Sequence, residues 1–307
     1  MRDLKTTSPS ISDPSQAGVA AAAVSYFLWG ILPIYWKLLD GISMVELLAH
    51  RMVWTLTAVL IFQTVRGRLS GLRDTWADPV SRRAHLKNSA LLSANWGLYV
   101  WAVGQGRIIE TSLGYFLVPL LNVALGRLWF GERLRRAQKV AIGFAAAGVT
   151  LLIVQVNTVP WIALGLAATW ASYGLVRKQS HASPLNGLAL ETTFAAPIAL
   201  GFIGWLTASG GAAFGNTSPS ATLLMVGTGV ISMVPLTLFA YGARRLKFTT
   251  LGLLQYLAPT CQFLIGWLVY REPFSLDRAA AFGLIWIGLA CYTIDAVRAS
   301  RRPLSPV

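Results

Sequence analysis

The sequence predicts an all-α integral membrane protein with ten transmembrane helices, and three observations lead to this prediction. Of the 307 residues, 55% are hydrophobic and only 12% are charged, whereas a soluble domain normally carries about 25% charged residues. Ten apolar stretches approach or exceed the length of about 20 residues that a helix needs to cross the hydrocarbon core. Connections rich in Lys and Arg alternate with connections that are poor in them. None of the stretches alternates apolar and polar residues as the strands of a membrane β-barrel do.

The apolar stretches follow one another with short connections, apart from a basic stretch around residues 66–87. The first stretch is too long for the hydrophobic region of a signal peptide, and a polar segment precedes it. We therefore expect a polar cytoplasmic N-terminus over 1–16, a first five-helix unit over 17–156, a second unit over 160–297, and a basic cytoplasmic tail over 298–307. The predicted spans are residues 17–39, 44–65, 88–106, 111–130, 137–156, 160–178, 186–208, 221–243, 250–270 and 277–297.

The positive charges predict the orientation of the chain. The N-terminus, the even-numbered loops and the C-terminal tail together hold 20 of the 26 Lys and Arg residues. By the positive-inside rule, both termini then lie in the cytoplasm, as expected for a multi-pass protein of the inner membrane. The net charge of +14 is thus a signal of topology. Nucleic-acid binding is not expected, because it would need a basic patch on a soluble face.

The two predicted units resemble each other in sequence. With a shift of 140 residues, seven of the thirty positions in 119–148 are identical, and they include Pro119 with Pro259 and Glu132 with Glu272. Five spans per unit is an odd number, so the second unit must enter the membrane from the opposite side. Two inverted repeats around a central site are the architecture of many secondary transporters.

Seven sequence runs stand in a consistent order along the chain: YFLWGILPIYWKL, HRMVW, NWGLYVWAV, ETSLGYFLVPLLNVALG-x₄-GERLRR, GLVRK, LALETTF and TTLGLLQYLAP. Together they resemble the RarD-type permeases of the EamA branch of the drug/metabolite transporter superfamily, over residues 17–297. The resemblance implies ten helices in two inverted five-helix repeats and a transport role, without a defined substrate. One departure is that the second repeat has REP (271–273) where the first has GER (131–133).

Two polar stripes mark the fourth and ninth spans. A proline in a helix cannot donate a hydrogen bond to the carbonyl four residues earlier, so such a kink should face protein or a water-filled cavity. Gly114 and Gly252 would allow bending or close helix approach there. The stripes indicate either a substrate cavity lined from both repeats or ordinary packing around two prolines. They consist of Tyr115, Pro119 and Asn122, and of Gln255, Pro259 and Gln262.

Aromatic residues in the middle of other spans, several of them beside an amide, are further candidates for the cavity. They indicate a pocket for a flat or amphipathic organic solute, including a cationic one, or else packing in the protein core. These candidates are Tyr26, Trp29, Asn95, Trp96, Tyr99, Tyr173 and Tyr256.

Three ionisable residues lie deep within predicted spans, where charge is expensive and therefore indicates function. They are His50, Arg51 and Glu191; the alternative is a structural ion pair between helices. Glu191 is the first candidate for proton coupling and His50 the second, whereas pairing of Arg51 with Glu191 would exclude coupling through Glu191. Charges nearer the span ends are expected to reach the interface, and these are Lys37, Glu46, Arg127 and Asp295.

The sequence shows no motif for catalysis, nucleotide binding or metal binding, and we expect no cofactor. A membrane transferase would need clustered carboxylates to hold magnesium, and the 12 acidic residues are scattered. Glycines in spans five and ten could pack the repeats together or form a homodimer contact. We therefore expect a secondary transporter for a small organic metabolite or drug-like solute. The alternatives are a facilitative channel, a partner-binding subunit or, less favoured, a membrane transferase.

Overall fold

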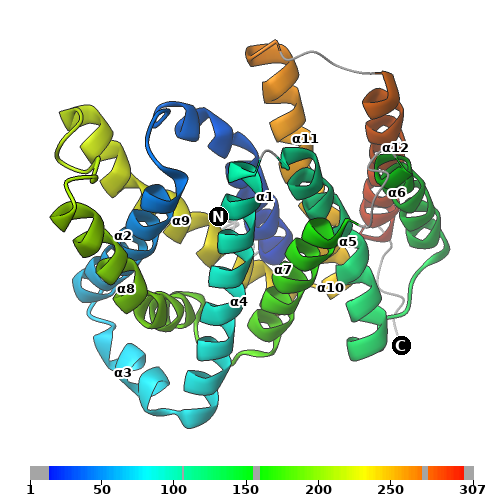
Figure 1. Cartoon of the computed structure of the whole chain (residues 1–307). Coiled ribbons are helices and arrows are strands. Elements are labelled where there is room, and N and C mark those ends of the chain that lie inside the picture. Colours follow the sequence, from blue (N-terminus) through cyan, green and yellow to red (C-terminus); the bar gives the residue numbers. More distant parts are fainter. Residues whose placement is uncertain (1–13, 106, 155–159, 272–275, 301–307) are drawn as a thin grey trace, which may run out of the picture.

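The computed structural model describes residues 14–105, 107–154, 160–271 and 276–300, and all regular structure within these ranges is helical (Figure 1). Seven helices in these ranges are long and apolar enough to cross a membrane. Large apolar side chains on the outside of the bundle are strongly exposed, among them Leu128 at 82% and Ile198 at 79%. Exposed apolar surface on this scale is unfavourable in water and suits contact with lipid. The predicted class, an all-α multi-pass membrane protein, is confirmed.

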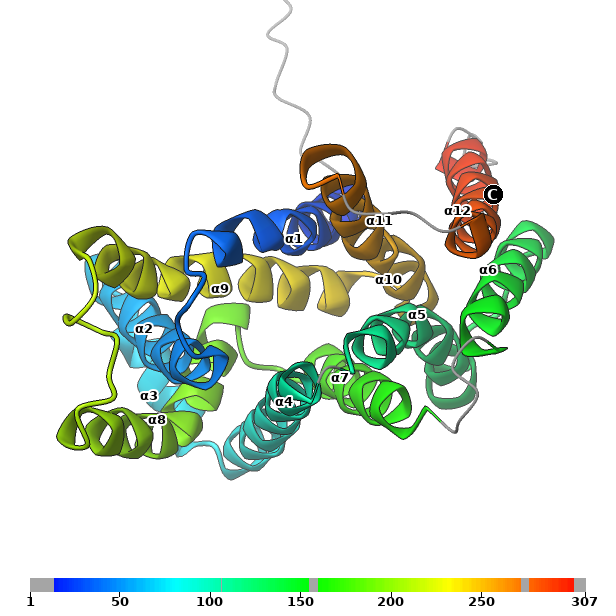
Figure 2. The same ribbon diagram turned by 45° about the horizontal axis from the view of Figure 1, so that its top comes forward.

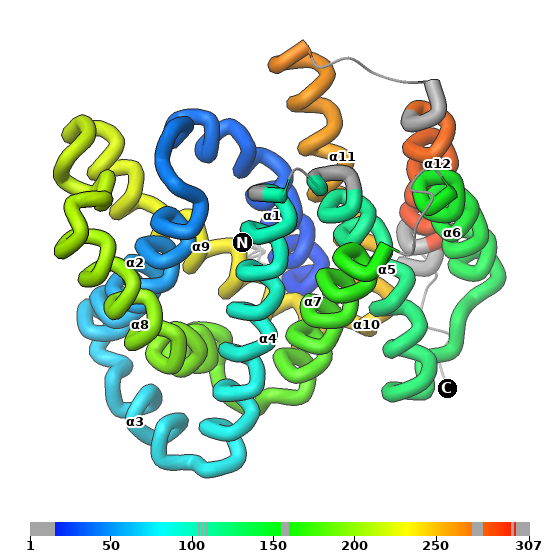
Figure 3. Tube along the Cα trace, viewed as in Figure 1, coloured from blue at the N-terminus to red at the C-terminus, as the bar shows by residue number. Residues whose placement is uncertain are grey.

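The chain forms twelve α-helices within the described ranges, and Figure 3 traces their order. The first half contains α1 (Pro14–Lys37), α2 (Met44–Val65), α3 (Leu69–Ala77), α4 (Pro79–Gly104), α5 (Ile108–Phe130) and α6 (Arg136–Val154). The second half contains α7 (Trp161–Gln179), α8 (Pro184–Ala208), α9 (Pro219–Arg245), α10 (Phe248–Gln255), α11 (Leu257–Leu264), a π-helical turn (Ile265–Val269) and α12 (Leu276–Ser300).

Seven of the ten predicted spans coincide with helices that are apolar enough to cross a membrane, and one of these runs through α10, α11 and the π-helical turn. The other three predicted spans fall on α4, α7 and α12, and α12 contains a shorter apolar stretch, Ala279–Asp295. Short α3 lies at one end of the bundle, at the foot of Figure 1. We call this end, where α2 finishes and α4 begins, the α3 end.

The basic stretch around 66–87 is helical, which corrects its prediction as a connection. It contains α3 and the first turns of α4. The carboxylate of Asp78 accepts hydrogen bonds from the backbone N–H groups of Val80 and Ser81, and Pro79 occupies the first turn. Both features favour the start of a helix. Hydropathy alone does not reveal this start, because α4 begins with charged residues on its exposed face.

The predicted ninth span is broken at Tyr256, between α10 and α11. Pro259 has no N–H to donate to the carbonyl of Gln255, which is consistent with the break. The phenol of Tyr256 is buried and donates to the carbonyl of Phe116 at 3.4 Å. In contrast, α5 runs unbroken through Pro119. The two proline positions are therefore similar in sequence but different in conformation.

The helices pair in a reciprocal way between the two halves. If α3 is set apart and α10–α11 count as one helix, each half has five helices. The packing of α1 with α9 then has a counterpart in that of α4 with α7, and the packing of α2 with α9 has one in that of α4 with α8. Helices at the same position in each half also pack together: α2 with α8, α5 with α10, and α6 with α12. Figure 2 shows α6 and α12 side by side at one edge.

The contact between α6 and α12 depends on two glycines in equivalent positions. A Cβ atom on Gly148 would lie 2.6 Å from the carbonyl oxygen of Ala281, and a Cβ atom on Gly288 would lie 2.6 Å from that of Ala141. Gly148 and Gly288 are 140 positions apart, and so are Ala141 and Ala281, as in the sequence repeat. The backbones of the two helices therefore approach each other as closely as the absence of side chains permits.

We expect Gly148→Ala and Gly288→Ala each to destabilise the protein by about 1–3 kcal/mol, because the new methyl group meets a backbone carbonyl that cannot turn away. Thermal unfolding in detergent measures this loss. Gly143→Ala and Gly283→Ala are matched controls on the same two helices, since a Cβ atom there meets nothing within 4 Å. Equal stability of all four variants would show that the close approach does not hold the helices together.

Candidate functional site

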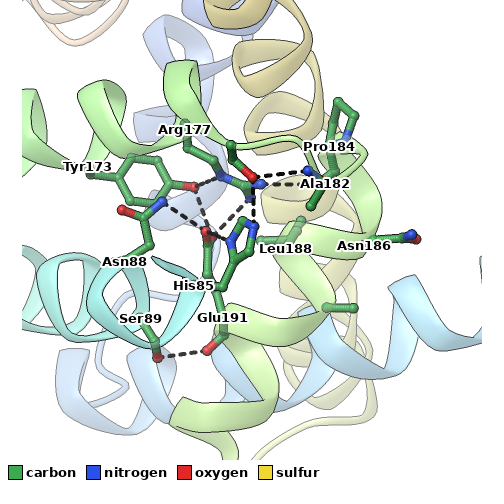
Figure 4. Close-up of polar contacts among 12 residues, drawn as sticks. His85, Asn88, Ser89, Tyr173, Arg177, Ala182, Pro184, Asn186, Leu188 and Glu191 are labelled. Atoms are coloured by element: carbon green, nitrogen blue, oxygen red, sulfur yellow. Dashed lines mark hydrogen bonds and ion pairs between the residues drawn. The ribbon is translucent and has the colours of Figure 1, made fainter. Parts of the chain in front are cut away.

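A buried polar network surrounds Glu191 on α8, near the α3 end (Figure 4). One carboxylate oxygen lies 2.8 Å from Nδ1 of His85 and accepts a hydrogen bond from Asn88 at 3.0 Å. The other accepts hydrogen bonds from Arg177 at 2.9 Å and from the phenol of Tyr173 at 3.1 Å. The side chains of Glu191 and His85 are fully buried and that of Arg177 is 2% exposed. Glu191 is thus the acceptor of four surrounding groups.

The network joins three helices. His85, Asn88 and Ser89 come from α4, Tyr173 and Arg177 from α7, and Glu191 from α8. The hydroxyl of Ser89 donates to the backbone carbonyl of Glu191 at 2.7 Å. These contacts connect α4 of the first half to α7 and α8 of the second half at the α3 end.

Gly187 makes room for the network on α8. A Cβ atom there would collide with the Arg177 guanidinium and the His85 ring. Removing one member of a buried ion pair leaves a charge without compensation, which is strongly destabilising. The alternative that the sequence left open, a structural network between helices, therefore describes Glu191 in this structure.

Arg51 lies elsewhere in the bundle and does not pair with Glu191. Its Nε donates to the hydroxyl of Ser232 on α9 at 2.6 Å. Its guanidinium carbon lies 3.9 Å from the ring centroid of Trp96 on α4 and 5.6 Å from that of Trp36 on α1. The phenols of Tyr99 and Tyr115 are close enough to interact with its charge. Among the described residues, no carboxylate forms an ion pair with Arg51.

Arg51, Trp96 and Tyr115 lie at similar depths in the bundle. Arg51 and Tyr115 each lie seven residues from the start of their helix, and Trp96 lies eight residues before the end of α4. At the helical rise of about 1.5 Å per residue, all three are roughly 10–12 Å from the helix ends that are opposite to the α3 end. Arg51, Trp96, Tyr99 and Tyr115 all retain accessible surface despite this depth. We call these four residues the Arg51 group.

A layer of aromatic residues lies nearer the α3 end. Phe239 on α9 has ring-centroid distances of 6.1 Å to Tyr26, 5.5 Å to Trp170 and 6.1 Å to Tyr173. All four side chains are buried, and we call them the aromatic plug. The predicted cavity residue Trp29 remains partly exposed, and its ring packs on Trp170 at 5.3 Å. Tyr26 and Tyr173, predicted as cavity residues, thus belong to a packed layer in this conformation.

The polar stripes of α5 and α10–α11 meet each other. The amide nitrogen of Asn122 donates to the amide oxygen of Gln255 at 3.2 Å, and both side chains are buried. Gly252 allows this contact, because a Cβ atom there would lie 2.9 Å from the carbonyl of Pro119. Gly114 makes a similar close approach to α7. Of the stripe residues, Tyr115 alone joins the Arg51 group.

Two other predicted residues are interhelical hydrogen-bond donors. The amide of Asn95 donates to the carbonyl of Leu166 and to the hydroxyl of Thr169, at 2.9 and 2.8 Å. Gln262 is exposed and donates to the backbone carbonyl of Trp29 at 3.2 Å. Both amides are therefore used in contacts between helices.

Glu46 corrects the expectation that charges near span ends reach the interface. Its side chain is buried, and its Oε1 accepts hydrogen bonds from the backbone N–H groups of Ala213 and Phe214 at 2.8 and 3.1 Å. His50 lies one turn further along α2, with Nε2 4.0 Å from the same oxygen and its ring stacked on Phe214 at 4.6 Å. Within the described structure neither ring nitrogen of His50 has a hydrogen-bond partner.

Glu132 stabilises a helix start, as its place at the end of α5 suggests. Its carboxylate accepts from the backbone N–H groups of Phe248 and Thr249 at 2.6 and 3.0 Å, and from the Thr249 hydroxyl at 2.7 Å. It therefore caps α10. Its repeat partner Glu272 lies outside the described residues.

Comparison with known proteins places this geometry in a family. The model of the EamA-like transporter family matches twice, over residues 16–154 and 158–294. The chain belongs to this family. It is 40% identical to the protein RarD of Streptomyces exfoliatus, over 91% of this chain and 88% of that protein. It is also 40% identical to the uncharacterized transporter YojE of Bacillus subtilis, over 94% of this chain and 97% of that protein.

One solved crystal structure shares the fold, with a TM-score of 0.71 at 22% identity, and the match covers 92% of this chain and 99% of that chain. The predicted resemblance to RarD-type permeases is confirmed. This EamA protein is a membrane transporter and not an enzyme. No group of His, Cys, Asp or Glu in the described part of this EamA chain could hold a metal ion.

The sequence did not single out His85 and Asn88 of this EamA protein, because they lie in or beside the stretch predicted as a loop. Arg177 is one of the basic residues that the positive-inside argument assigns to the loops, but it is buried within α7. A signal was present in the spacing: Ser81, His85, Asn88 and Ser89 recur at three- and four-residue intervals, as the buried face of a helix does.

We expect Arg177→Met and Glu191→Leu each to destabilise this EamA protein by roughly 3–5 kcal/mol, because each leaves the other charge buried and unpaired. The double variant should be less destabilised than the sum of the two single changes, since no unpaired charge then remains. Thermal unfolding in detergent provides the measurement, with Arg83→Met as the control at an exposed position on α4. Single variants as stable as the Arg83 variant would refute a structural ion pair.

Proposed function

We propose that this protein is a secondary transporter of the inner membrane that moves a small organic metabolite or drug-like solute by alternating access. In this proposal ten helices cross the membrane in two inverted repeats. The first repeat contains α1, α2, α4, α5 and α6; the second contains α7, α8, α9, α10–α11 and α12. The two matches to the family model and the reciprocal helix pairing support this division.

Two carboxylates add support for the inverted repeats. Glu46 of α2 binds the connection between α8 and α9, and Glu191 of α8 binds the start of α4, which follows α2 and α3. Each half thus uses a glutamate on its second helix to bind the other half, at the α8–α9 connection in one case and at the first turns of α4 in the other. The two contacts lie at opposite ends of the bundle, as inversion requires.

The observation that carries the proposal is the contrast between the two ends. At the α3 end, the residues of the aromatic plug and of the Glu191 network are all buried. All four residues of the Arg51 group, in contrast, retain accessible surface. Arg51, Trp96 and Tyr115 lie roughly 10–12 Å from the opposite helix ends at a rise of about 1.5 Å per residue. In this proposal the Arg51 group is reached from that end while the plug closes the other, as one state of an alternating-access carrier requires.

The distribution of positive charge orients this state. Arg82, Arg83, Arg244 and Arg245 lie at the α3 end, so the positive-inside rule assigns this end to the cytoplasm. In this orientation both chain termini are cytoplasmic, and the Arg51 group faces outward. The exchange of conformations would open the plug and close the outer side.

Uphill transport would have to use an ion gradient or exchange, since the sequence has no nucleotide-binding motif. Protonation of Glu191 would break its ion pair and leave Arg177 buried without a counter-charge, which is costly. His50 has no such obstacle: it is buried, lies 4.0 Å from Glu46 and has both ring nitrogens without hydrogen-bond partners among the described residues. We therefore favour the His50–Glu46 pair over Glu191 for proton coupling.

A homodimer remains a prediction. Gly143 and Gly283 could form its contact, because a Cβ atom at either position would have no neighbouring atom within 4 Å. A facilitative channel is the main alternative function. It differs from a carrier in one respect that can be measured, because its pathway is open to both sides at once.

The test is the accessibility of a single cysteine at Tyr99, in a protein whose two native cysteines, Cys261 and Cys291, are replaced by serine. We expect Tyr99→Cys to react with an impermeant thiol reagent in right-side-out vesicles and also in inverted vesicles, because alternating access exposes the site to each side in turn. Asn216→Cys should react from outside only and Arg82→Cys from inside only. Ile198→Cys, which faces lipid, should not react.

Reaction of Tyr99→Cys from one side alone would contradict alternating access. Labelling of the Asn216 and Arg82 variants in the reverse sense would overturn the orientation. Osmotic swelling of proteoliposomes in small neutral solutes separates a carrier from a channel: a carrier leaves the swelling rate at that of empty liposomes, and a channel raises it.

A further inference from the structure

We propose that Arg51 is the anion-binding residue of the transport site and that the solute carries a single carboxylate on a planar organic body. This inference deepens the transport function proposed above and rests on it. It concerns the substrate class, and it departs from the sequence-based expectation that aromatic walls would suit cations.

The first argument is the charge balance. A charged side chain deep in the bilayer region is costly, and such residues almost always have a partner. The buried Arg177 has one in Glu191 at 2.9 Å. In the described part of the chain, Arg51 has a serine hydroxyl and two tryptophan rings around it but no carboxylate. The site therefore carries an uncompensated positive charge that an anion would neutralise.

The second argument is the geometry of the guanidinium. Its Nε donates to Ser232, and its carbon lies 3.9 Å from the ring centroid of Trp96. The two terminal nitrogens make no hydrogen bond to described residues, and both retain accessible surface. They are thus fixed in direction and accessible. A carboxylate matches this pair of donors, since guanidinium and carboxylate groups bind each other through two parallel hydrogen bonds.

The third argument concerns the number of charges. One arginine balances one negative charge. A phosphomonoester carries about 1.5–2 negative charges at neutral pH, and part of that charge would remain unbalanced at this depth. A monocarboxylate fits the charge of the site better.

The fourth argument concerns the body of the solute. The partly exposed rings of Tyr99 and Tyr115 lie 5.9 Å apart between centroids, beside the guanidinium. Aromatic rings prefer offset or edge-on contact with other flat groups. Their phenols also offer hydrogen bonds to polar atoms of the solute. Together these residues favour a planar body attached to the carboxylate.

The probes are three compounds with one phenyl ring and different charge: phenylacetate, phenylacetamide and phenethylamine. We expect phenylacetate to raise the apparent Tm of the purified protein in a concentration-dependent manner, because a ligand that binds the folded state stabilises it. The apparent Kd of the amide should be at least about tenfold weaker, the scale of one charge-assisted hydrogen bond. The amine should give no stabilisation.

Substitutions at Arg51 test whether this residue causes the preference for phenylacetate. Arg51→Gln should lose the preference for phenylacetate, and Arg51→Lys should retain part of it, because lysine keeps the charge without the planar pair of donors. Arg127→Gln, at an exposed position on α5, is the matched control and should behave as the wild type. Ser232→Ala should weaken phenylacetate binding less than Arg51→Gln does, because the charge remains while the hydrogen bond that orients the guanidinium is lost.

The comparison of the three compounds on the wild-type protein needs no variant, so it decides the matter even where Arg51→Gln fails to fold. Equal Tm shifts for all three compounds, a preference for the amine, or no shift with any compound would overturn the assignment. A preference for phenylacetate that persists in Arg51→Gln would also overturn it. None of these results would alter two-sided labelling at Tyr99, so they are distinguishable from a failure of the transport proposal.

Discussion

A carboxylate without water must find its hydrogen-bond donors within the protein, and Glu191 shows how much of this structure follows from that constraint. Its two oxygens are surrounded by His85, Asn88, Tyr173 and Arg177. These donors come from two helices that belong to different halves of the chain. The requirement for satisfied polar groups in a low-dielectric interior thereby fixes how the halves meet at the α3 end. Gly187 and the aromatic plug are arranged around the same group, since Tyr173 belongs to both.

The two deep arginines show opposite solutions to the same problem. Arg177 is compensated by a carboxylate and is buried, so it stabilises one arrangement of α4, α7 and α8. Arg51 contacts a hydroxyl and the rings of Trp96 and Trp36, has no carboxylate partner in the described part of the chain, and retains accessible surface. In the transport function that we propose, Arg177 holds one conformation and Arg51 binds the solute.

Much of this could be read from the sequence, and the failures have physical causes. Hydropathy predicted the helical membrane class, and the depth of Arg51 and Glu191 marked them as unusual. The sequence analysis misses His85 and Asn88, the partners of Glu191 on α4, because the start of α4 combines a charged exposed face with a buried face. A hydropathy average over such a segment indicates a loop, although its three- and four-residue spacing indicates a helix.

The polar stripes show a different limit of sequence reasoning. The sequence places Asn122 and Gln255 on two polar stripes, but a stripe on one helix does not reveal what faces it. In the structure they face each other. Likewise, Glu46 was expected to reach the interface because it is close to a helix end, yet a backbone segment of the other half covers it. Long-range packing decides both cases, and a single sequence contains no direct record of it.

The most direct test of this account is the distance between spin labels at Arg82 on α4 and Gln179 at the end of α7, measured by pulsed electron paramagnetic resonance in lipid nanodiscs. Both positions are exposed and lie beside the Glu191 network. The account predicts one narrow distance distribution in the otherwise unchanged protein and a broad one after Glu191→Gln, because the network holds these two helices together. A distribution that is already broad without the Glu191 change, or one that Glu191→Gln leaves narrow, would contradict the central role of the buried carboxylate.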